Sequence, residues 1–150
     1  MTGPEVAVAA FKQGFNCSQA VLSAYAPSLG LERETAVRLA AGFGGGISRR
    51  GETCGAVTGA VMVLGLKFCG AGSAECRPEE RMAEREKVYE RVRQFMAGFQ
   101  ARHGSLVCRD LLGCDISKPE DYQRAREQQL FVGLCPKFVQ TAAEVIETLL

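Results

Sequence analysis

The sequence predicts an all-α fold, a bundle of about seven helices in a single domain spanning residues 1–150. Apolar residues recur at helical spacing along most of the chain. Glycines and prolines punctuate the helical segments, and no run of alternating apolar and polar residues is long enough for a sheet. A chain of 150 residues can bury a core that is large enough to fold without disulfides.

Four helices are predicted in the first half of the chain, over Glu5 to Gln13, Cys17 to about Tyr25, Glu32 to Phe43 and Cys54 to about Phe68. Gly14 closes the first helix, and Asn16 and Thr53 stand where N-caps of the second and fourth are expected. In the third helix, Leu39 falls on the predicted buried face with Ala36, Ala40 and Phe43. A glycine-containing connector follows the fourth helix at residues 69–77.

The second half begins with the longest predicted helix, which Pro78 opens and Gly104 ends. Its predicted apolar stripe consists of Met82, Tyr89, Val92, Phe95, Met96 and Phe99. His103, the only histidine, is predicted to cap the C-terminus of this helix, where the helix dipole favours a positive charge, rather than to act as a ligand or base. Three further helices are expected, from Ser105 to Leu112, after a cap at Ser117, and from Pro136 onward.

The composition argues against nucleic acid and membranes as partners of this protein. Lysine and arginine number 18 against 17 acidic residues, and no basic stripe with interleaved aromatic residues is present, so we expect no nucleic-acid partner. The most apolar stretch, Ala56 to Leu66, is too short to span a bilayer, and the first residues do not resemble a signal peptide. With seven cysteines and no export signal, we expect a cytoplasmic protein with reduced thiols and no membrane contact.

Four of the seven cysteines stand at predicted helix starts: Cys17, Cys54, Cys108 and Cys135. The positive end of a helix dipole favours an anion, so a thiol there is expected to ionise more easily and to act as a nucleophile or a metal ligand. If the four ends converge, their thiolates would repel one another unless a cation or an iron–sulfur core held them. Cys114 is a reserve third ligand, while Cys69 and Cys76 are interpreted as buried thiols or a labile pair.

The segment "CGAVTG" places small residues beside Cys54. Gly55 and Gly59, with Ala56 and Ala60, would let another helix backbone or a cofactor come close to this sulfur. "GFGGG" at residues 42–46 does not fit a nucleotide-binding loop, because no strand precedes it and its glycine spacing differs. A glycine-rich turn that leaves room near Cys54 is the better interpretation, with Arg49 and Arg50 either solvated or facing an anion.

The segments "GFNCSQAVL", "AAGFGGGISRRGETCGAVTGAVMVLGL", "GSLVCRDLLGCDIS" and "LFVGLCPKFVQTAAEVI" together resemble the C_GCAxxG_C_C family, whose members are described as redox-active. The resemblance covers nearly the whole chain. It implies an all-helical fold and a redox role for Cys17, Cys54, Cys108 and Cys135. A similar domain occurs beside haem in split-Soret cytochromes, where an iron–sulfur cluster is associated with it, but no Cys-x-x-Cys-His is present here for covalent haem.

Several functions stay open. The four cysteines could bind an iron–sulfur cluster, with [2Fe–2S] favoured, and exchange electrons with a redox partner protein; Gly55, Ala56 and Gly59 would then lie near the cluster. Alternatively, Cys54 attacks an oxidised partner, and Cys17 or another neighbouring cysteine resolves the mixed disulfide. Outside redox chemistry, the thiolates could hold a structural zinc ion. The chain could also be a metal-free interaction module that forms a homodimer through the small residues around Gly55.

Overall fold

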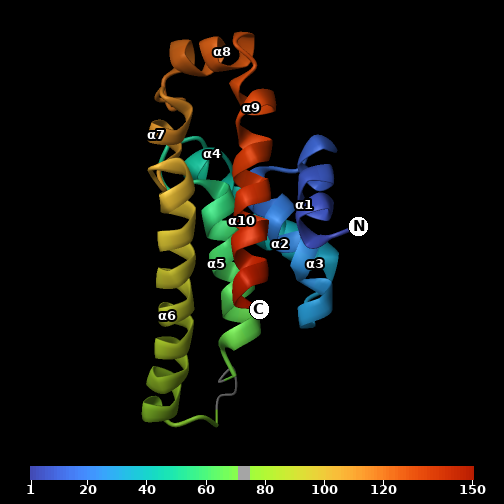
Figure 1. The fold of residues 1–150 in the computed structure, drawn as a ribbon, viewed down its shortest axis with the longest axis vertical. Coiled ribbons are helices and arrows are strands. Elements are labelled where there is room, and N and C mark those ends of the chain that lie inside the picture. Colours follow the sequence, from blue (N-terminus) through green and yellow to red (C-terminus); the bar gives the residue numbers. More distant parts are fainter. Residues whose placement is uncertain (71–74) are drawn as a thin grey trace.

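The computed structural model describes residues 1–70 and 75–150, and this part of the chain is helical without a single strand (Figure 1). The predicted fold class is therefore confirmed. Part of the predicted connector at 69–77 lies outside the described residues. The α-helices are α1 (Gly3–Lys12), α2 (Cys17–Tyr25), α3 (Arg33–Ala40), α4 (Gly44–Ile47), α5 (Gly55–Phe68), α6 (Pro78–His103), α7 (Cys108–Leu112), α8 (Pro119–Glu127), α9 (Leu130–Gly133) and α10 (Cys135–Leu149); short 3₁₀ turns cover Pro27–Leu29 and Ala41–Phe43.

Three long helices, α5, α6 and α10, run side by side, and α1, α2 and α3 pack along one flank of this layer (Figure 1). Helix α2 contacts both α5 and α1, so it joins the two groups. The core between them is apolar and includes Phe95 and Phe99 of α6, Leu22 of α2 and Ile146 of α10. The short helices α7, α8 and α9 lie together across one end of the long layer (Figure 1).

The contact between α2 and α5 is close because glycine occupies the α5 side. A Cβ atom at Gly59 would lie 2.8 Å from the Ser18 carbonyl oxygen and 3.0 Å from the Val21 Cβ. The small-residue pattern predicted an approach of either a helix or a cofactor at this point. At Gly59 the structure places helix α2 there.

Local capping fixes where α2 begins. Asn16 accepts a hydrogen bond from the N–H of Gln19, and the Gln19 side chain accepts one from the N–H of Asn16. The predicted N-cap at Asn16 is therefore confirmed.

The predicted N-caps at Thr53 and Ser117 are wrong. Cys54, rather than Thr53, is the N-cap of α5, because its carbonyl accepts hydrogen bonds from the N–H groups of Val57 and Thr58. Lys118 precedes α8, and the Ser117 hydroxyl instead donates to Asp115.

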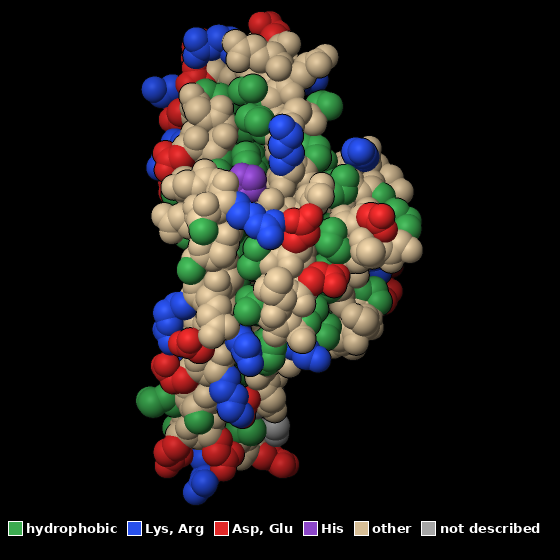
Figure 2. Space-filling model, viewed as in Figure 1, with side chains coloured by type: hydrophobic (Ala, Val, Ile, Leu, Met, Phe, Trp, Pro, Cys, Tyr) green, Lys and Arg blue, Asp and Glu red, His purple; other side chains and the backbone are tan. Residues whose placement is uncertain are grey.

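The predicted apolar stripe of α6 is only partly buried. Phe95 and Phe99 are fully enclosed, but Met82 is 58% and Tyr89 47% exposed, because the first half of α6 extends beyond the helices that cover it (Figure 1). Charged side chains of both signs alternate over this end in the space-filling view (Figure 2), and they include the pair Glu84 and Lys87. Leu39 of α3, predicted to be buried, is 56% exposed.

His103 lies in the last turn of α6, as predicted, and also packs against α10. Its ring packs between Phe99 and Phe138, with both ring centroids 5.0 Å away, and its Nε2 lies 2.8 Å from the Thr141 hydroxyl. Gly104 in the left-handed region ends α6 and donates to the Gln100 carbonyl. His103 therefore joins α6 to α10 at a partly buried position.

Candidate functional site

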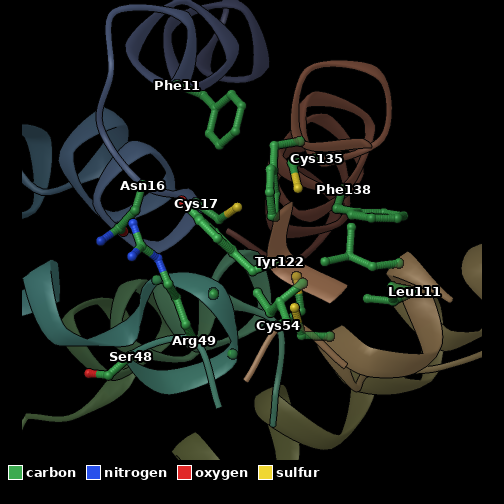
Figure 3. Close-up of a pocket in the computed structure, with 18 of the residues that line it drawn as sticks. Phe11, Asn16, Cys17, Ser48, Arg49, Cys54, Leu111, Tyr122, Cys135 and Phe138 are labelled. Atoms are coloured by element: carbon green, nitrogen blue, oxygen red, sulfur yellow. The ribbon is translucent and has the colours of Figure 1, made fainter. Parts of the chain in front are cut away.

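Four cysteines from four different elements line one cavity of about 610 Å³. They are Cys17 of α2, Cys54 immediately before α5, Cys108 of α7 and Cys135 of α10. All four are buried and none forms a disulfide. Figure 3 shows Cys17 and Cys135 facing each other across the cavity, with Cys54 below them. The volume is within the range of about 300–1,000 Å³ that is typical of sites for small molecules and cofactors.

A short backbone pairing brings Cys54 and Cys108 together. Thr53 and Val107 form an isolated antiparallel bridge. In this bridge the N–H of Cys54 donates to the Leu106 carbonyl at 2.8 Å, and the N–H of Cys108 donates to the Glu52 carbonyl at 2.7 Å. Two cysteines that lie far apart in the sequence are thus held on neighbouring backbone segments.

Glycines allow the backbone to approach two of the cysteines. A Cβ atom at Gly46 would lie 2.7 Å from the Cys108 Cβ and 2.6 Å from the Glu52 backbone nitrogen. A Cβ atom at Gly55 would lie 3.1 Å from the Cys17 Cβ. No larger residue would fit at Gly46 without moving the backbone, so this glycine of the "GFGGG" stretch is required for the shape of the wall.

The turn that contains Gly46 is left-handed. Five successive residues have positive φ angles: Gly45 (66°), Gly46 (65°), Ile47 (65°), Ser48 (52°) and Arg49 (64°). For a residue with a Cβ atom this conformation costs about 1–2 kcal/mol. Hydrogen bonds from Gly51 to Gly45 and from Glu52 to Gly46 hold the turn in place. Strain of this kind concentrates at functional sites.

Burial determines the acidity of most of these thiols. It raises the pKa of Cys54 from 9.0 to about 11, although hydrogen bonds from the N–H groups of Ala56 and Val57 act in the opposite direction. It also raises the pKa of Cys108 to about 12, with a further contribution from the neighbouring Cys54 and Cys135 sulfurs. The expectation that helix starts would make these two thiols more acidic is therefore wrong, because desolvation outweighs the helix dipole.

Cys17 and Cys135 share a hydrogen bond between their side chains. This bond, followed by burial, raises the pKa of Cys17 well above its usual value. The same bond lowers the pKa of Cys135, because the Cys17 thiol donates to the Cys135 sulfur and stabilises its thiolate. Cys135 is thus the most acidic of the four thiols that line the cavity, a distinction that the sequence alone did not reveal.

Of the other predicted site residues, only some line the cavity. Gly55 lines the cavity and Ala56 is buried beside Cys54, whereas Gly59 does not reach the cavity wall. Cys114, the reserve ligand, is half-buried and also does not line it. Over residues 1–70 and 75–150, no three cysteine, histidine or acidic side chains are grouped closely enough to share one metal ion.

The aromatic part of the cavity wall was not predicted as part of a site. Aromatic rings come from α1, α8 and α10, namely Phe11, Tyr122 and Phe138 (Figure 3), and Phe131 of α9 adds a fourth. The rings of Tyr122 and Phe131 are 5.6 Å apart. Arg49 is the one charged residue among the described residues that line this cavity, and its guanidinium lies 4.6 Å from the centre of the Tyr122 ring. The four aromatic residues come from distant parts of the chain, so no local sequence signal identifies them, whereas the sequence indicated Arg49 as a residue that could face an anion.

Fold and site together define an all-helical protein with a buried, cysteine-lined cavity. Within that class, the chain belongs to the C_GCAxxG_C_C family, described as "Putative redox-active protein (C_GCAxxG_C_C)", which matches residues 15–149. No curated protein and no solved structure matches it. In the described part of the chain, none of the helices combines the length and apolar character needed to cross a membrane.

Proposed function

We propose that Cys17, Cys54, Cys108 and Cys135 bind an iron–sulfur cluster, most simply [2Fe–2S], and that the protein transfers single electrons to and from a partner protein in the cytoplasm. One observation carries the proposal: all four cysteines line the same buried cavity. Four cysteine thiolates are the usual ligand set of such clusters. Membership in a family described as redox-active supports the same class of function.

The raised pKa values of Cys54 and Cys108 support binding of a group with a cationic core. Burial raises the pKa of Cys54 to about 11 and of Cys108 to about 12, so these side chains stay protonated near neutral pH when nothing compensates their charge. A bound cation favours the thiolate and releases those protons. The bound cluster would supply one-electron redox chemistry.

The chain's own residues would then tune the site. The N–H groups of Ala56 and Val57 hydrogen-bond to the Cys54 sulfur, and such bonds to a ligand sulfur raise the reduction potential of a cluster. The rings of Phe11 and Phe138 line the cavity and limit the access of water. Gly46 and Gly55 keep the backbone close to the sulfurs, which restricts the movement of Cys108 and Cys17.

A second function is favoured by the hydrogen bond between Cys17 and Cys135. In this alternative the Cys135 thiolate attacks a disulfide of an oxidised partner, and one partner sulfur leaves as a thiolate. Cys17, after losing its proton, then attacks the Cys135 sulfur and releases the second partner sulfur. The partner disulfide gains two electrons, and Cys17 and Cys135 end as a disulfide. This pairing replaces the expected attack by Cys54.

Anaerobic purification tests the two functions directly. The visible spectrum is recorded before and after reduction, and iron, acid-labile sulfide and zinc are measured per chain. Equal amounts of iron and sulfide, with a colour that bleaches on reduction, support the cluster. A colourless, metal-free protein that forms a reversible Cys17–Cys135 disulfide supports thiol exchange instead. Stoichiometric zinc without iron or sulfide would contradict both proposals and indicate a structural site.

A further inference from the structure

The polar side chains that line the cysteine cavity differ in how far their hydrogen-bonding capacity is used. Asn16 accepts from the Gln19 N–H and donates to the Ala41 carbonyl, and the Ser48 hydroxyl donates to the Gly42 carbonyl. In Figure 3 both side chains point away from the centre of the cavity. Arg49 differs: within the described parts of the chain, neither a carboxylate nor a carbonyl pairs with its guanidinium.

The backbone holds Arg49 in this position. Arg49 is the last residue of the left-handed turn, and its N–H donates to the Gly44 carbonyl. Its side chain reaches from this turn to the face of Tyr122 (Figure 3). The Tyr122 ring also packs on Phe131. Arg49 is an exposed residue of the cavity wall, while the four cysteines are buried. Stacking on Tyr122 leaves the N–H edge of the guanidinium free to bind a ligand.

We propose that the aromatic end of this cavity binds a small organic anion with a flat apolar body, whose carboxylate pairs with Arg49. A guanidinium binds a carboxylate through two parallel hydrogen bonds. The rings of Tyr122, Phe131 and Phe11 provide an apolar surface for the body of such a ligand. The carboxylate of the ligand lies at Arg49, because this is the one charged side chain among the described residues that line the cavity. The inference does not depend on what the cysteines bind.

Binding of 2-naphthoate to the full chain, purified without oxygen, tests the proposal by titration calorimetry. The neutral amide of the same ring system is the matched ligand. We expect the carboxylate to bind about fivefold more tightly than the amide, because a partly exposed ion pair contributes up to about that factor. Arg49→Gln should abolish the difference between the two ligands and Arg49→Lys should retain part of it. Arg50→Gln, which removes the neighbouring exposed arginine outside the cavity wall, should leave it unchanged.

The position of the ligand can be read from the tyrosines. The chain has three, and incorporation of 3-fluorotyrosine gives one ¹⁹F resonance for each. Addition of 2-naphthoate should shift the Tyr122 resonance and leave those of Tyr25, in the core, and Tyr89, on α6, in place. A shift confined to Tyr89, equal affinity for the two ligands, equal effects of Arg49→Gln and Arg50→Gln, or no binding would each overturn the proposal. Iron and sulfide content is measured separately, so either proposal can fail alone.

Discussion

Replacing Gly59 by alanine tests the close contact of α2 and α5, which sets Cys17 beside the start of α5. The new Cβ atom would lie 2.8 Å from the Ser18 carbonyl oxygen and 3.2 Å from the Ser18 Cα. Both are backbone atoms, so neither can rotate away, and the two helices must separate. The Val21 Cβ, 3.0 Å away, blocks the remaining space.

The size of the effect follows from two opposing contributions. Alanine is favoured over glycine in a helix interior by about 1 kcal/mol. Overpacking a close contact costs about 1–3 kcal/mol, and an obstacle made of backbone places Gly59→Ala toward the upper value. We therefore expect the free energy of unfolding to fall by about 1–2 kcal/mol. Gly65→Ala is the matched control in the same helix, since its Cβ would meet nothing within 4 Å and should stabilise by about 0.5–1 kcal/mol.

Urea unfolding followed by far-UV circular dichroism measures both variants under identical anaerobic conditions. The difference between them, about 1.5–3 kcal/mol, corresponds to a separation of roughly 1–2 M in midpoint. Equal midpoints, or a Gly59→Ala protein that is the more stable of the two, would refute the reasoning that glycine is required here by helix contact.

Three further predictions concern the protonation of buried or partly buried side chains. Because folding raises the pKa of Cys54 to about 11 and of Cys108 to about 12, the reduced, metal-free chain should keep its stability below pH 9 and lose it as the pH rises toward 12; urea unfolding over this range checks the sign. Burial lowers the pKa of His103, so stability should also fall as the pH drops below about 6.5, and His103→Gln should remove this acid limb in the same assay. Cys17→Ala removes the hydrogen bond to Cys135 and should move alkylation of Cys135 by iodoacetamide to higher pH, as peptide mapping would show; an unchanged pH profile would contradict the assigned donor.

Local signals in the sequence predicted much of the helical framework. The N-cap at Asn16, the opening of the longest helix at Pro78 and its end at Gly104 were all predicted, because each depends on neighbouring residues. Burial along α6 was predicted less well. Periodicity identified one face, but it could not show that the first half of that face, with Met82 and Tyr89, has no helix over it.

Non-local structure explains what the sequence missed at the site. The bridge between Thr53 and Val107 joins segments that are far apart in the chain, and the stack of Arg49 on Tyr122 depends on where α8 lies. The acidity of Cys54 was predicted in the wrong direction because desolvation is a property of the folded molecule. The grouping of Cys17, Cys54, Cys108 and Cys135 matches the cavity wall, while their binding of a common group stays a prediction.

The central claim is that these four cysteines, and no others, form one redox centre. Seven single Cys→Ser variants, purified without oxygen and analysed for iron and sulfide per chain, test it most directly. Substitution at each of the four cavity positions should lower both contents by at least about tenfold, because even the loss of a residue that only supports a ligand lowers metal affinity by about that factor. Substitution at Cys69, Cys76 or Cys114 should leave iron and sulfide at the level of the unaltered protein. Loss in Cys114→Ser together with retention in Cys108→Ser would contradict the account.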